Sequence, residues 1–310
     1  MTSSTQGLHH ITAICGDPAE NRQFFVDVLG LRLVKKTVNF DDPGTYHLYY
    51  GDELGRPGSA LTFFAFAGAP RGQPGLGAAL EIAFAVPAHA MDFWQTRLAD
   101  HGIQTRRERR FGEQALCFEG PHGNRLALVA CDWAARMPAW AGAPVADEYA
   151  IRGFHGVTLA LAELEPSAAV LEQVLGFQRV AHEGDRLRLR AEAGDGLGSV
   201  VDLHIDPAFA SAREGVGSIH HVAFRARDTA HQLELRERLA GHGLHATPQI
   251  DRQYFQSVYF REPGGVLFEI ATDGPGFTVD EPAHELGSSL KLPPQYEPRR
   301  ELIEKALLDF

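Results

Sequence analysis

A fourfold repeat constrains the fold of this 310-residue chain more than any other feature of its sequence. The four copies open with the strand-like runs GLHHITAI, AALEIAFAV, GFHGVTLAL and GSIHHVAF. Each opening run is followed by a helix-like segment, at residues 17–30, 89–102, 165–177 and 229–242, and then by further strand-like runs. Such a period indicates one supersecondary unit used several times. We therefore predict four modules of the type βαβββ.

Proline and glycine mark the ends of the predicted helices. Pro18 and Pro166 stand where the first helical turn accepts proline. Glycine closes each of the four helices, at Gly30, Gly102, Gly176 and Gly243. A module with one amphipathic helix and a small sheet with one apolar face is not stable alone. We therefore expect an α+β protein in which the modules pack in pairs to form two domains.

A segment rich in alanine and proline, ARMPAWAGAPVADEYA at 135–150, divides the chain. Because it has no clear period, we expect it to be an interdomain linker. The prediction is an N-terminal domain at 1–134, a C-terminal domain at 151–275, each with two modules, and a tail at 276–310. A hydrophobic content of 44% is enough for two cores. The Pro-rich tail should pack as an arm or contact another subunit of a homo-oligomer.

The bulk properties exclude several classes of partner. A formal charge of −11 argues against nucleic acid and anionic membrane surfaces, which reward clustered lysine and arginine. No apolar run approaches the roughly 20 residues of a membrane span, and the first residues do not resemble a secretory signal. The three cysteines have no CxxC spacing, which is typical of buried thiols in a reducing compartment. We expect a cytoplasmic protein.

Overlaying the four modules brings two histidines and one carboxylate to related positions. His10 and His221 occupy the same place in the opening runs of the first and fourth modules, and Glu269 lies within an apolar run that ends the fourth. A buried carboxylate needs a partner. Two imidazoles and one carboxylate form the facial triad of non-haem Fe(II) oxygenases, and can also hold Mn(II) or, less typically, Zn(II). The structural alternatives are a hydrogen-bonded core histidine or a surface histidine for each HH pair, and an ion pair of Glu269 with an arginine such as Arg252 or Arg261.

The second and third modules do not repeat this set. At the position of His10 they carry Glu81 and Gly156; at the position of Glu269 the other modules carry Phe63, Ala127, and either Asp202 or Leu203. We therefore expect Glu81 to be a salt-bridged residue and not part of a second metal site. His155 comes one position early and should point to the opposite face. The other histidines, His47 among them, are interpreted as surface or local hydrogen-bonding residues.

The repeat and these residues together resemble the vicinal oxygen chelate superfamily, in which βαβββ units pair into cupped sheets around a metal. Within it, the runs GLHHITAICGDPAENRQFFVDVLG, GSIHHVAFRA and LFEIATDGPGF look most like the ring-cleaving dioxygenases related to chlorohydroquinone and hydroquinone 1,2-dioxygenases. The resemblance implies a glyoxalase-like fold with mixed, curved sheets. It also implies that the metal ligands come from the first and last modules, here His10, His221 and Glu269. Supporting catalytic roles are implied for His9, Thr12, His220, Arg252 and Tyr259.

Physical reasons can be given for some of these roles. Thr12 shares a strand face with His10, so its hydroxyl can hydrogen-bond a bound group. His9 and His220 face away from their neighbours in a regular strand, so a direct role needs a twist or a bulge, and orientation of the ligands is the simpler role. Arg252 and Tyr259 can bind a phenolate or stabilise anionic oxygen, or else pack in the sheet with a solvated head.

The function implied by the resemblance is an Fe(II)-dependent dioxygenase, with Mn(II) as the alternative metal. Its substrates would be O2 and a small hydroxylated aromatic compound, with hydroquinones favoured, and both oxygen atoms would enter the product. Two other hypotheses stay open. One is a metal-dependent isomerase or lyase of the glyoxalase kind. The other is a non-catalytic protein that binds small aromatic molecules.

Overall fold

The computed structural model describes residues 4–192, 196–206, 208–308 and 310, and its order of elements is that of four βαβββ modules. The first module contains β1 (Leu8–Cys15), α1 (Pro18–Arg22), which runs on into a π-helical turn, β2 (Arg32–Asn39), β3 (Asp42–Gly51) and β4 (Ala60–Ala65). The second contains β5 (Ala78–Pro87), α2 (Met91–Asp100), β6 (Arg106–Arg110), β7 (Glu113–Glu119) and β8 (Arg125–Cys131). The third contains β9 (Phe154–Leu161), α3 (Glu165–Gln173), β10 (Phe177–Glu183), β11 (Arg186–Ala191) and β12 (Val200–Ile205). The fourth contains β13 (Ile219–Ala226), α4 (Thr229–Gly241), β14 (Ile250–Asp251), β15 (Phe255–Arg261) and β16 (Leu267–Pro275), and α5 (Arg300–Ala306) follows in the tail.

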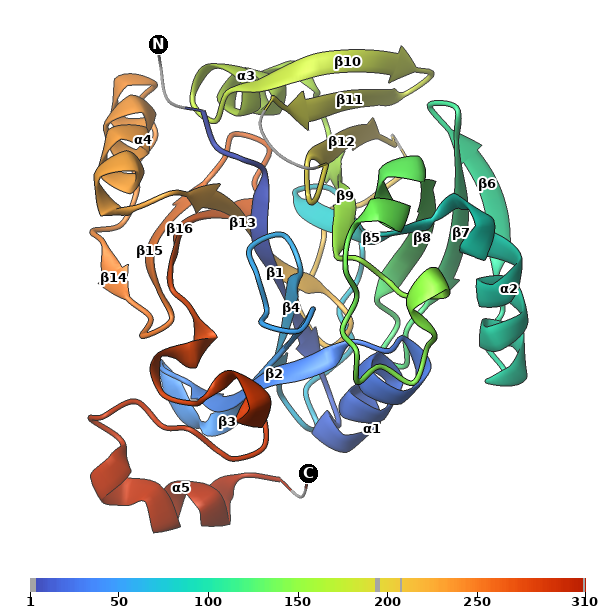
Figure 1. Cartoon of the computed structure of the whole chain (residues 1–310). Helices are drawn as coiled ribbons and strands as arrows, with labels where there is room; N and C mark the ends of the chain where they lie inside the picture. The colour runs from blue at the N-terminus through green and yellow to red at the C-terminus, as the bar shows by residue number, and fades with distance from the viewer. Residues whose placement is uncertain (1–3, 193–195, 207, 309) are drawn as a thin grey trace.

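The strands form two eight-stranded, curled sheets (Figure 1). The strand order is β14-β15-β16-β13-β1-β4-β3-β2 in the first sheet and β10-β11-β12-β9-β5-β8-β7-β6 in the second. In every module the opening and closing strands are parallel neighbours, whereas β1 pairs with β13, and β5 with β9, in antiparallel fashion. The prediction of an α+β fold with mixed, curved sheets is therefore confirmed.

Each sheet takes one module from each half of the chain. The first and fourth modules share one sheet and the second and third share the other, so the sheets do not follow the division at residues 135–150. The limits 1–134 and 151–275 stay a prediction. The segment between them is packed, because Tyr149 stacks on Phe93 with ring centroids 4.3 Å apart and its carbonyl accepts a hydrogen bond from Trp94.

The glycines predicted to end the helices all have left-handed backbone conformations. Their φ angles are 75° at Gly30, 74° at Gly102, 78° at Gly176 and 74° at Gly243. Residues with a Cβ atom rarely adopt this conformation, which turns the chain sharply at the end of a helix. The same stop signal thus returns the chain to the sheet in every module.

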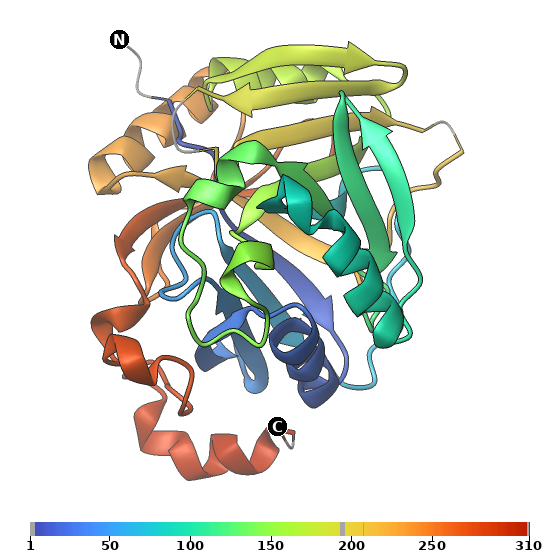
Figure 2. The same cartoon turned by 45° about the vertical axis from the view of Figure 1, so that its right-hand side comes forward.

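One continuous hydrophobic core joins the two sheets and the module helices. Phe25 next to α1, Trp94 of α2, Leu171 of α3 and Leu239 of α4 all belong to it. Figure 2 shows α1 and α2 on the outside of the curled sheets. Because side chains alternate along a strand, the residues between the core positions point to the concave face of each sheet. We call the concave side of the sheet that contains β1 and β13 the first cup.

The tail packs against the first sheet, as one of the two predictions for it stated. Lys35 of β2 is fully buried and forms ion pairs with Asp280 and Glu281 of the tail. Farther along, Leu292 and Ile303 pack against Val38. Contact with another subunit stays a prediction.

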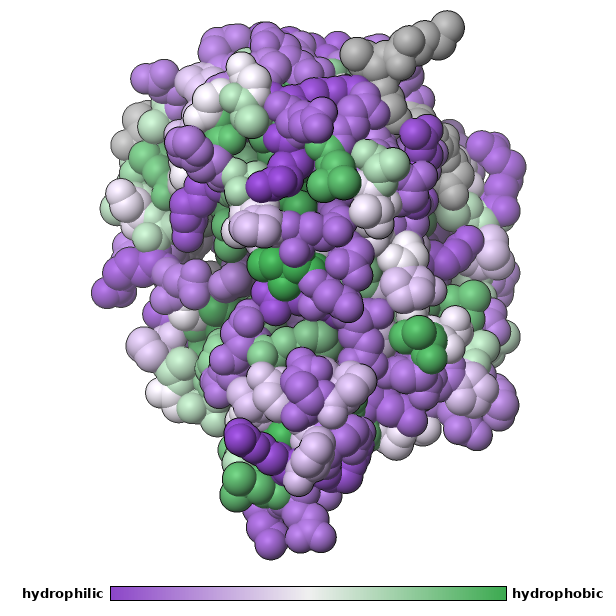
Figure 3. Space-filling model, turned by 90° about the vertical axis from the view of Figure 1, so that its left-hand side faces the viewer, coloured by the Kyte–Doolittle hydropathy of each residue, from purple (hydrophilic) through white to green (hydrophobic). Residues whose placement is uncertain are grey.

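The face in Figure 3 is mainly hydrophilic, with hydrophobic residues in small separate groups. Among the helices that the structure describes, none combines the length and the apolar character that crossing a membrane requires.

Candidate metal centre

Three side chains that are far apart in the sequence meet in the first cup. His10 lies on β1, His221 on β13 and Glu269 on β16. The Nε2 atom of His10 lies 3.3 Å from Nε2 of His221 and 3.2 Å from Oε2 of Glu269, and the His221 and Glu269 atoms are 2.9 Å apart. All three residues are buried. The structure thus brings together the residues predicted as ligands, and the binding of an ion belongs to the proposal below.

β-Bulges explain how His9 and His220 reach the same cup as the ligands. Leu8 and His10 pair with the adjacent residues Phe224 and Ala223, so the strand carries an extra residue at His9. On β13 the corresponding irregularity lies at His220. A bulge lets two successive side chains lie on one side of the sheet. A direct role of these two histidines was predicted to need a twist or a bulge, and both strands have such a bulge.

His9 determines which nitrogen of His10 carries the hydrogen. The Nε2 atom of His9 lies 3.1 Å from the carbonyl oxygen of Thr272, so this nitrogen must donate. Burial, together with the nearby His10, holds the pKa of His9 well below its usual value, so its ring is neutral and its Nδ1 accepts. The donor is then Nδ1 of His10, 2.9 Å away. The Nε2 atom of His10 is left with a lone pair directed at the other two ligands.

His220 is hydrogen-bonded to His221 in the same way as His9 is to His10. Their Nδ1 atoms are 2.7 Å apart. Burial lowers the pKa of His221 to about 4 although Glu269 opposes the shift, so His221 is neutral at neutral pH. When Nδ1 of His221 donates to His220, its Nε2 also presents a lone pair. Hydrogen bonds of this kind fix the orientation and tautomer of histidine ligands.

Glu269, the third predicted ligand, is an ionised carboxylate in a buried position. Burial by itself would raise the pKa of Glu269, but His10 and His221 outweigh it and hold the pKa well below the usual value. Its Oε1 accepts a hydrogen bond of 2.5 Å from Ser257, whereas its Oε2 has no hydrogen-bond partner among the described residues. Neither Arg252 nor Arg261 forms an ion pair with it: the first pairs with Asp41 and the second donates to a backbone carbonyl.

These donor atoms fit a divalent cation. Two neutral imidazole nitrogens and one carboxylate oxygen direct lone pairs at a common point, and lone pairs so placed repel one another unless a positive charge lies between them. Oxygen and nitrogen donors in this number form a facial triad that leaves adjacent positions for other ligands. The orphaned Oε2 of Glu269 is the observation that supports this assignment most directly.

The other predicted site residues lie around this centre. Tyr259 is opposite Glu269 on β15, and its ring packs edge-on against His221 with centroids 5.7 Å apart. Arg252 lies over the Tyr259 ring, 5.5 Å from its centroid, while it also pairs with the exposed Asp41. Thr12 faces the cup from β1, and its hydroxyl is 2.8 Å from that of Thr62.

The pairing of strands corrects one predicted equivalence. Ala223 lies opposite Glu269, and the corresponding residue of the first module, Thr12, lies opposite Thr62. The prediction that Phe63 occupies the position of Glu269 was therefore wrong by one residue. Phe63 points into the core instead, because neighbouring residues of a strand face opposite sides.

Thr62 belongs to a hydrogen-bonded chain that the sequence analysis missed. The Nε2 atom of His47 lies 2.9 Å from the Thr62 hydroxyl, and its Nδ1 lies 2.9 Å from the hydroxyl of Tyr49. His47 is half-buried in the first cup, so of the two interpretations given for it, surface residue or local hydrogen-bonding residue, the structure supports the second. The spacing of His47 and Tyr49, two residues apart on one strand, places both on one face and is the signal that could have identified them.

The corresponding positions of the second sheet are filled with ion pairs. Glu81 pairs with Arg110, which confirms the prediction of a salt bridge. Thr158 lies opposite Asp202, so Asp202, and not Leu203, is the equivalent of Glu269. Asp202 accepts two hydrogen bonds, of 2.7 and 2.8 Å, from Arg188. Arginines thus supply the positive charge that these carboxylates require.

His155 also differs from its prediction. A bulge in the β5–β9 pairing lies at this residue, just as the bulge in the first sheet lies at His220. His155 therefore turns into the concave side of the second sheet, where its Nε2 lies 3.2 Å from Glu113. The expectation that it faces the opposite side was wrong, because it assumed a regular strand.

Known proteins resemble this chain over its whole length. The model of the Glyoxalase/Bleomycin resistance protein/Dioxygenase superfamily matches residues 7–128 and 153–270. MhqO of Bacillus subtilis, whose name assigns it to the ring-cleaving dioxygenases, is 47% identical over 310 residues, covering 100% of this chain and 98% of its own. The chlorohydroquinone/hydroquinone 1,2-dioxygenase of Sphingobium indicum is 33% identical over 321 residues, covering 100% of this chain and 98% of its own.

Solved structures show the same fold. A crystal structure from Bacillus subtilis, described as a dioxygenase, superimposes with a TM-score of 0.95 at 47% identity, and the match covers 99% of this chain and 98% of that one. Glyoxalase I from Zea mays superimposes with a TM-score of 0.62 at 15% identity, covering 86% of this chain and 92% of its own. The second likeness concerns the fold alone.

Proposed function

The chain belongs to the Glyoxalase/Bleomycin resistance protein/Dioxygenase superfamily, and we propose that within it the protein is an Fe(II)-dependent ring-cleaving dioxygenase for hydroquinones. Membership of the ring-cleaving dioxygenases follows from relatives that match over the whole chain. The metal, the substrate and the cytoplasmic location are parts of the proposal. The observation that carries it is the meeting of His10, His221 and Glu269 around an orphaned carboxylate oxygen.

The three ligands would hold the ion through His10 Nε2, His221 Nε2 and Glu269 Oε2. When bound, Fe(II) supplies adjacent coordination positions for a substrate oxygen and O2 together with the electrons that O2 needs in order to react. Mn(II) suits the same donors and is the alternative. His9 and His220 keep the two imidazoles in the tautomer that presents Nε2.

Arg252 and Tyr259 are suited to hold an oxygen anion of the substrate. Burial and the nearby Glu269 raise the pKa of the Tyr259 phenol, so it stays protonated and donates a hydrogen bond. Although burial opposes it, the contacts of Arg252 with Tyr259 and Asp41 raise the pKa of its guanidinium. The apolar part of the cup wall, formed by Phe255, Ala223 and Ala271 among others, excludes water from the reacting groups.

The proposed reaction consumes one molecule of O2 for each ring opened. The bond between the hydroxylated carbon and its neighbour breaks, and each of these two carbons gains one oxygen atom. With hydroquinone the first becomes a carboxyl carbon and the second an aldehyde carbon. The product is therefore a carboxylate at neutral pH, although the substrate is neutral.

Oxygen consumption by the Fe(II)-loaded protein tests this proposal. The protein should be loaded without air and then offered hydroquinones and catechols, with 18O2 as the gas. Uptake of equal amounts of O2 and hydroquinone, with both labelled atoms in the product, is the expected result. Turnover under strict anaerobiosis would instead favour the glyoxalase-type isomerase or lyase, and aromatic binding without metal would favour the non-catalytic binder.

The replacement His10→Ala tests the contribution of the first module. Because His10 supplies one of only three ligands, the variant should lose the metal as well as the activity. Metal analysis of the purified protein after dialysis measures the first effect. Full metal content in this variant would mean that the second half of the chain binds the ion by itself.

A further inference from the structure

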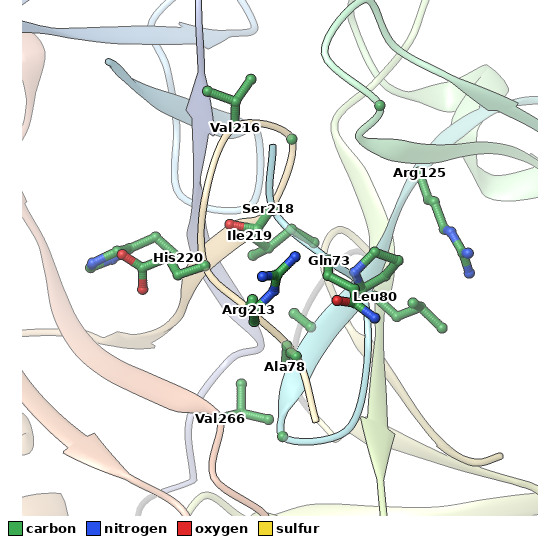
Figure 4. A pocket seen from close by; sticks show the side chains of 18 of the residues that line it. Gln73, Ala78, Leu80, Arg125, Arg213, Val216, Ser218, Ile219, His220 and Val266 are labelled. Atoms are coloured by element: carbon green, nitrogen blue, oxygen red, sulfur yellow. The ribbon is translucent and has the colours of Figure 1, made fainter. Parts of the chain in front are cut away.

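A cavity of about 380 Å³ adjoins the metal centre at the junction of the two sheets. Its walls come from residues 71–80, which lead into β5, from residues 212–219, which lead into β13, and from the turn between β7 and β8. His220 and His221 line it, and Figure 4 shows His220 at one side and Arg125 at the other. A molecule in this cavity would therefore lie beside a metal ligand. The volume suits a small organic molecule.

The charges that line the cavity are mostly positive and are not neutralised by ion pairs. Four arginines contribute to its walls, namely Arg71, Arg125, Arg213 and Arg261, against two glutamates, Glu119 and Glu214. None of these six side chains forms an ion pair within the part of the chain that the structure describes. The chain as a whole has a formal charge of −11. A surplus of guanidinium groups at one place in an acidic protein indicates a site for an anion.

Arg213 lines the cavity from the segment that leads into β13. In Figure 4 its guanidinium lies near the middle of the view, between the side chains of Ser218 and Gln73. Guanidinium groups donate two parallel hydrogen bonds to a carboxylate, and such charged pairs are stronger than neutral ones. Arg261, the last residue of β15, lines the same cavity as His220 and His221.

The cavity also offers apolar surface for a carbon skeleton. Ile219, Val266 and Leu80 line it along with the charged residues (Figure 4). Apolar walls with a few placed charges are typical of sites for small organic anions. An inorganic anion would gain nothing from this apolar surface.

We propose that this cavity, the arginine pocket, binds the carboxylate of a small ring compound or of the open-chain product made from it, with Arg213 as the main contact. The nature of the ligand rests on the function proposed above, which turns even a neutral hydroquinone into a carboxylate. The two sources share one chemistry, which is a carboxylate on a small unsaturated carbon skeleton. The pocket thus determines which substrates are preferred or how firmly the product is held.

Equilibrium binding tests the pocket without any turnover. The probes are 2,5-dihydroxybenzoate and hydroquinone, which differ by one carboxylate, added without air to the Fe(II)-loaded protein in a calorimeter. Arg213→Gln removes one guanidinium charge from the pocket, and Arg136→Gln is the control, because Arg136 is also exposed but lies outside the pocket. The carboxylated probe should bind about tenfold less tightly to Arg213→Gln, and hydroquinone equally well to all three proteins.

A carboxylate can also bind iron directly, so the measurement is repeated in the His10→Ala background. Dependence on Arg213 should persist there if the pocket itself recognises the anion. Equal affinities of the wild-type protein and Arg213→Gln for 2,5-dihydroxybenzoate in both backgrounds would overturn the proposal. Because binding needs no reaction, this result is independent of the oxygen measurements: an inactive protein that keeps the arginine dependence would refute the dioxygenase proposal alone.

Steady-state kinetics separates the two sources of the carboxylate. If the pocket serves a substrate, Arg213→Gln raises KM about tenfold when the carboxylated probe is turned over and leaves KM unchanged for hydroquinone. If it serves the product, the variant weakens inhibition by the ring-opened product and leaves both KM values unchanged. Kinetic constants equal to those of Arg136→Gln in every one of these measurements would overturn the proposal.

Discussion

Ala223 lies directly opposite Glu269 in the parallel pair of β13 and β16 and opposite His10 in the antiparallel pair of β13 and β1. It is fully buried and shares the concave face with both. Because its side chain is a single methyl group, the imidazole and the carboxylate can approach each other across it. The small residue between His10 and Glu269 is thus a condition for their meeting.

Ala223→Leu should displace the ligands and lower the metal content. The added atoms need space that His10 and Glu269 now occupy, so we expect metal affinity to fall at least about tenfold. Ala127→Leu is the control, because Ala127 is equally buried at the corresponding concave face of the second sheet. Both variants should lose about 1–3 kcal/mol of stability through overpacking. Metal analysis should distinguish them, and equal metal contents would contradict this role of Ala223.

His220→Ala should weaken metal binding although His220 is not a ligand. It removes the hydrogen-bond partner of His221 Nδ1, and such a loss commonly reduces metal affinity about 10- to 100-fold. His155→Ala is the matched control, because His155 occupies the equivalent bulge in the second sheet and has no ligand beside it. Competition with a chelator measures both affinities. A loss of the same size in His155→Ala would point to a general effect on folding.

The sequence was sufficient to predict the modules and to identify the three residues that meet at the candidate metal centre, but not the packing around them. His10 and His221 could be matched because their opening runs are alike, and Glu269 because an acid in an apolar strand requires a partner. The bulges at His9, His155 and His220 could not be foreseen, since they arise from pairing with strands distant in the sequence. A shift of one residue turns a side chain to the other face, which is also why Phe63 was chosen in place of Thr62.

His47→Ala should reduce turnover while the metal stays bound. His47 faces the cup, and burial together with the nearby His10 and His221 keeps its pKa well below the usual value, so its ring is neutral and can accept a hydrogen bond from a substrate hydroxyl in place of Thr62 or Tyr49. We expect kcat to fall about 100-fold. Added imidazole should restore part of the activity, and Tyr49→Phe, which removes only the hydroxyl next to His47, should have a smaller effect. Unchanged kcat in His47→Ala would exclude this role.

Lys35→Met should destabilise the protein by releasing the tail. The Lys35 ammonium is buried between Asp280 and Glu281, and removing one partner of a buried ion pair typically costs about 3–5 kcal/mol, because the remaining charges lose their compensation. Lys36→Met is the control, because Lys36 is partly exposed and its ammonium lies over the rings of Tyr46 and Phe310. Loss of these cation–π contacts should lower the free energy of unfolding by about 1 kcal/mol or less. Urea unfolding measures both values. Similar losses in the two variants would contradict the assigned importance of the buried pair.

The carboxylate of Glu113, which lies at the second sheet, should make the stability of the folded protein decrease in acid. Burial by itself would raise its pKa, but His155 and Arg188 outweigh burial and lower the pKa to about 2. A carboxyl group with a lowered pKa in the folded state stabilises the protein above its unfolded pKa, and this stabilisation disappears as the pH falls from about 4.5 to about 2. The contribution at pH 7 is at most about 3 kcal/mol. Glu113→Gln should therefore be less stable than the wild-type protein at pH 7 and should approach it near pH 2. Urea unfolding across this range tests the prediction, and a constant difference in stability at all pH values would show that the carboxylate charge is not the cause.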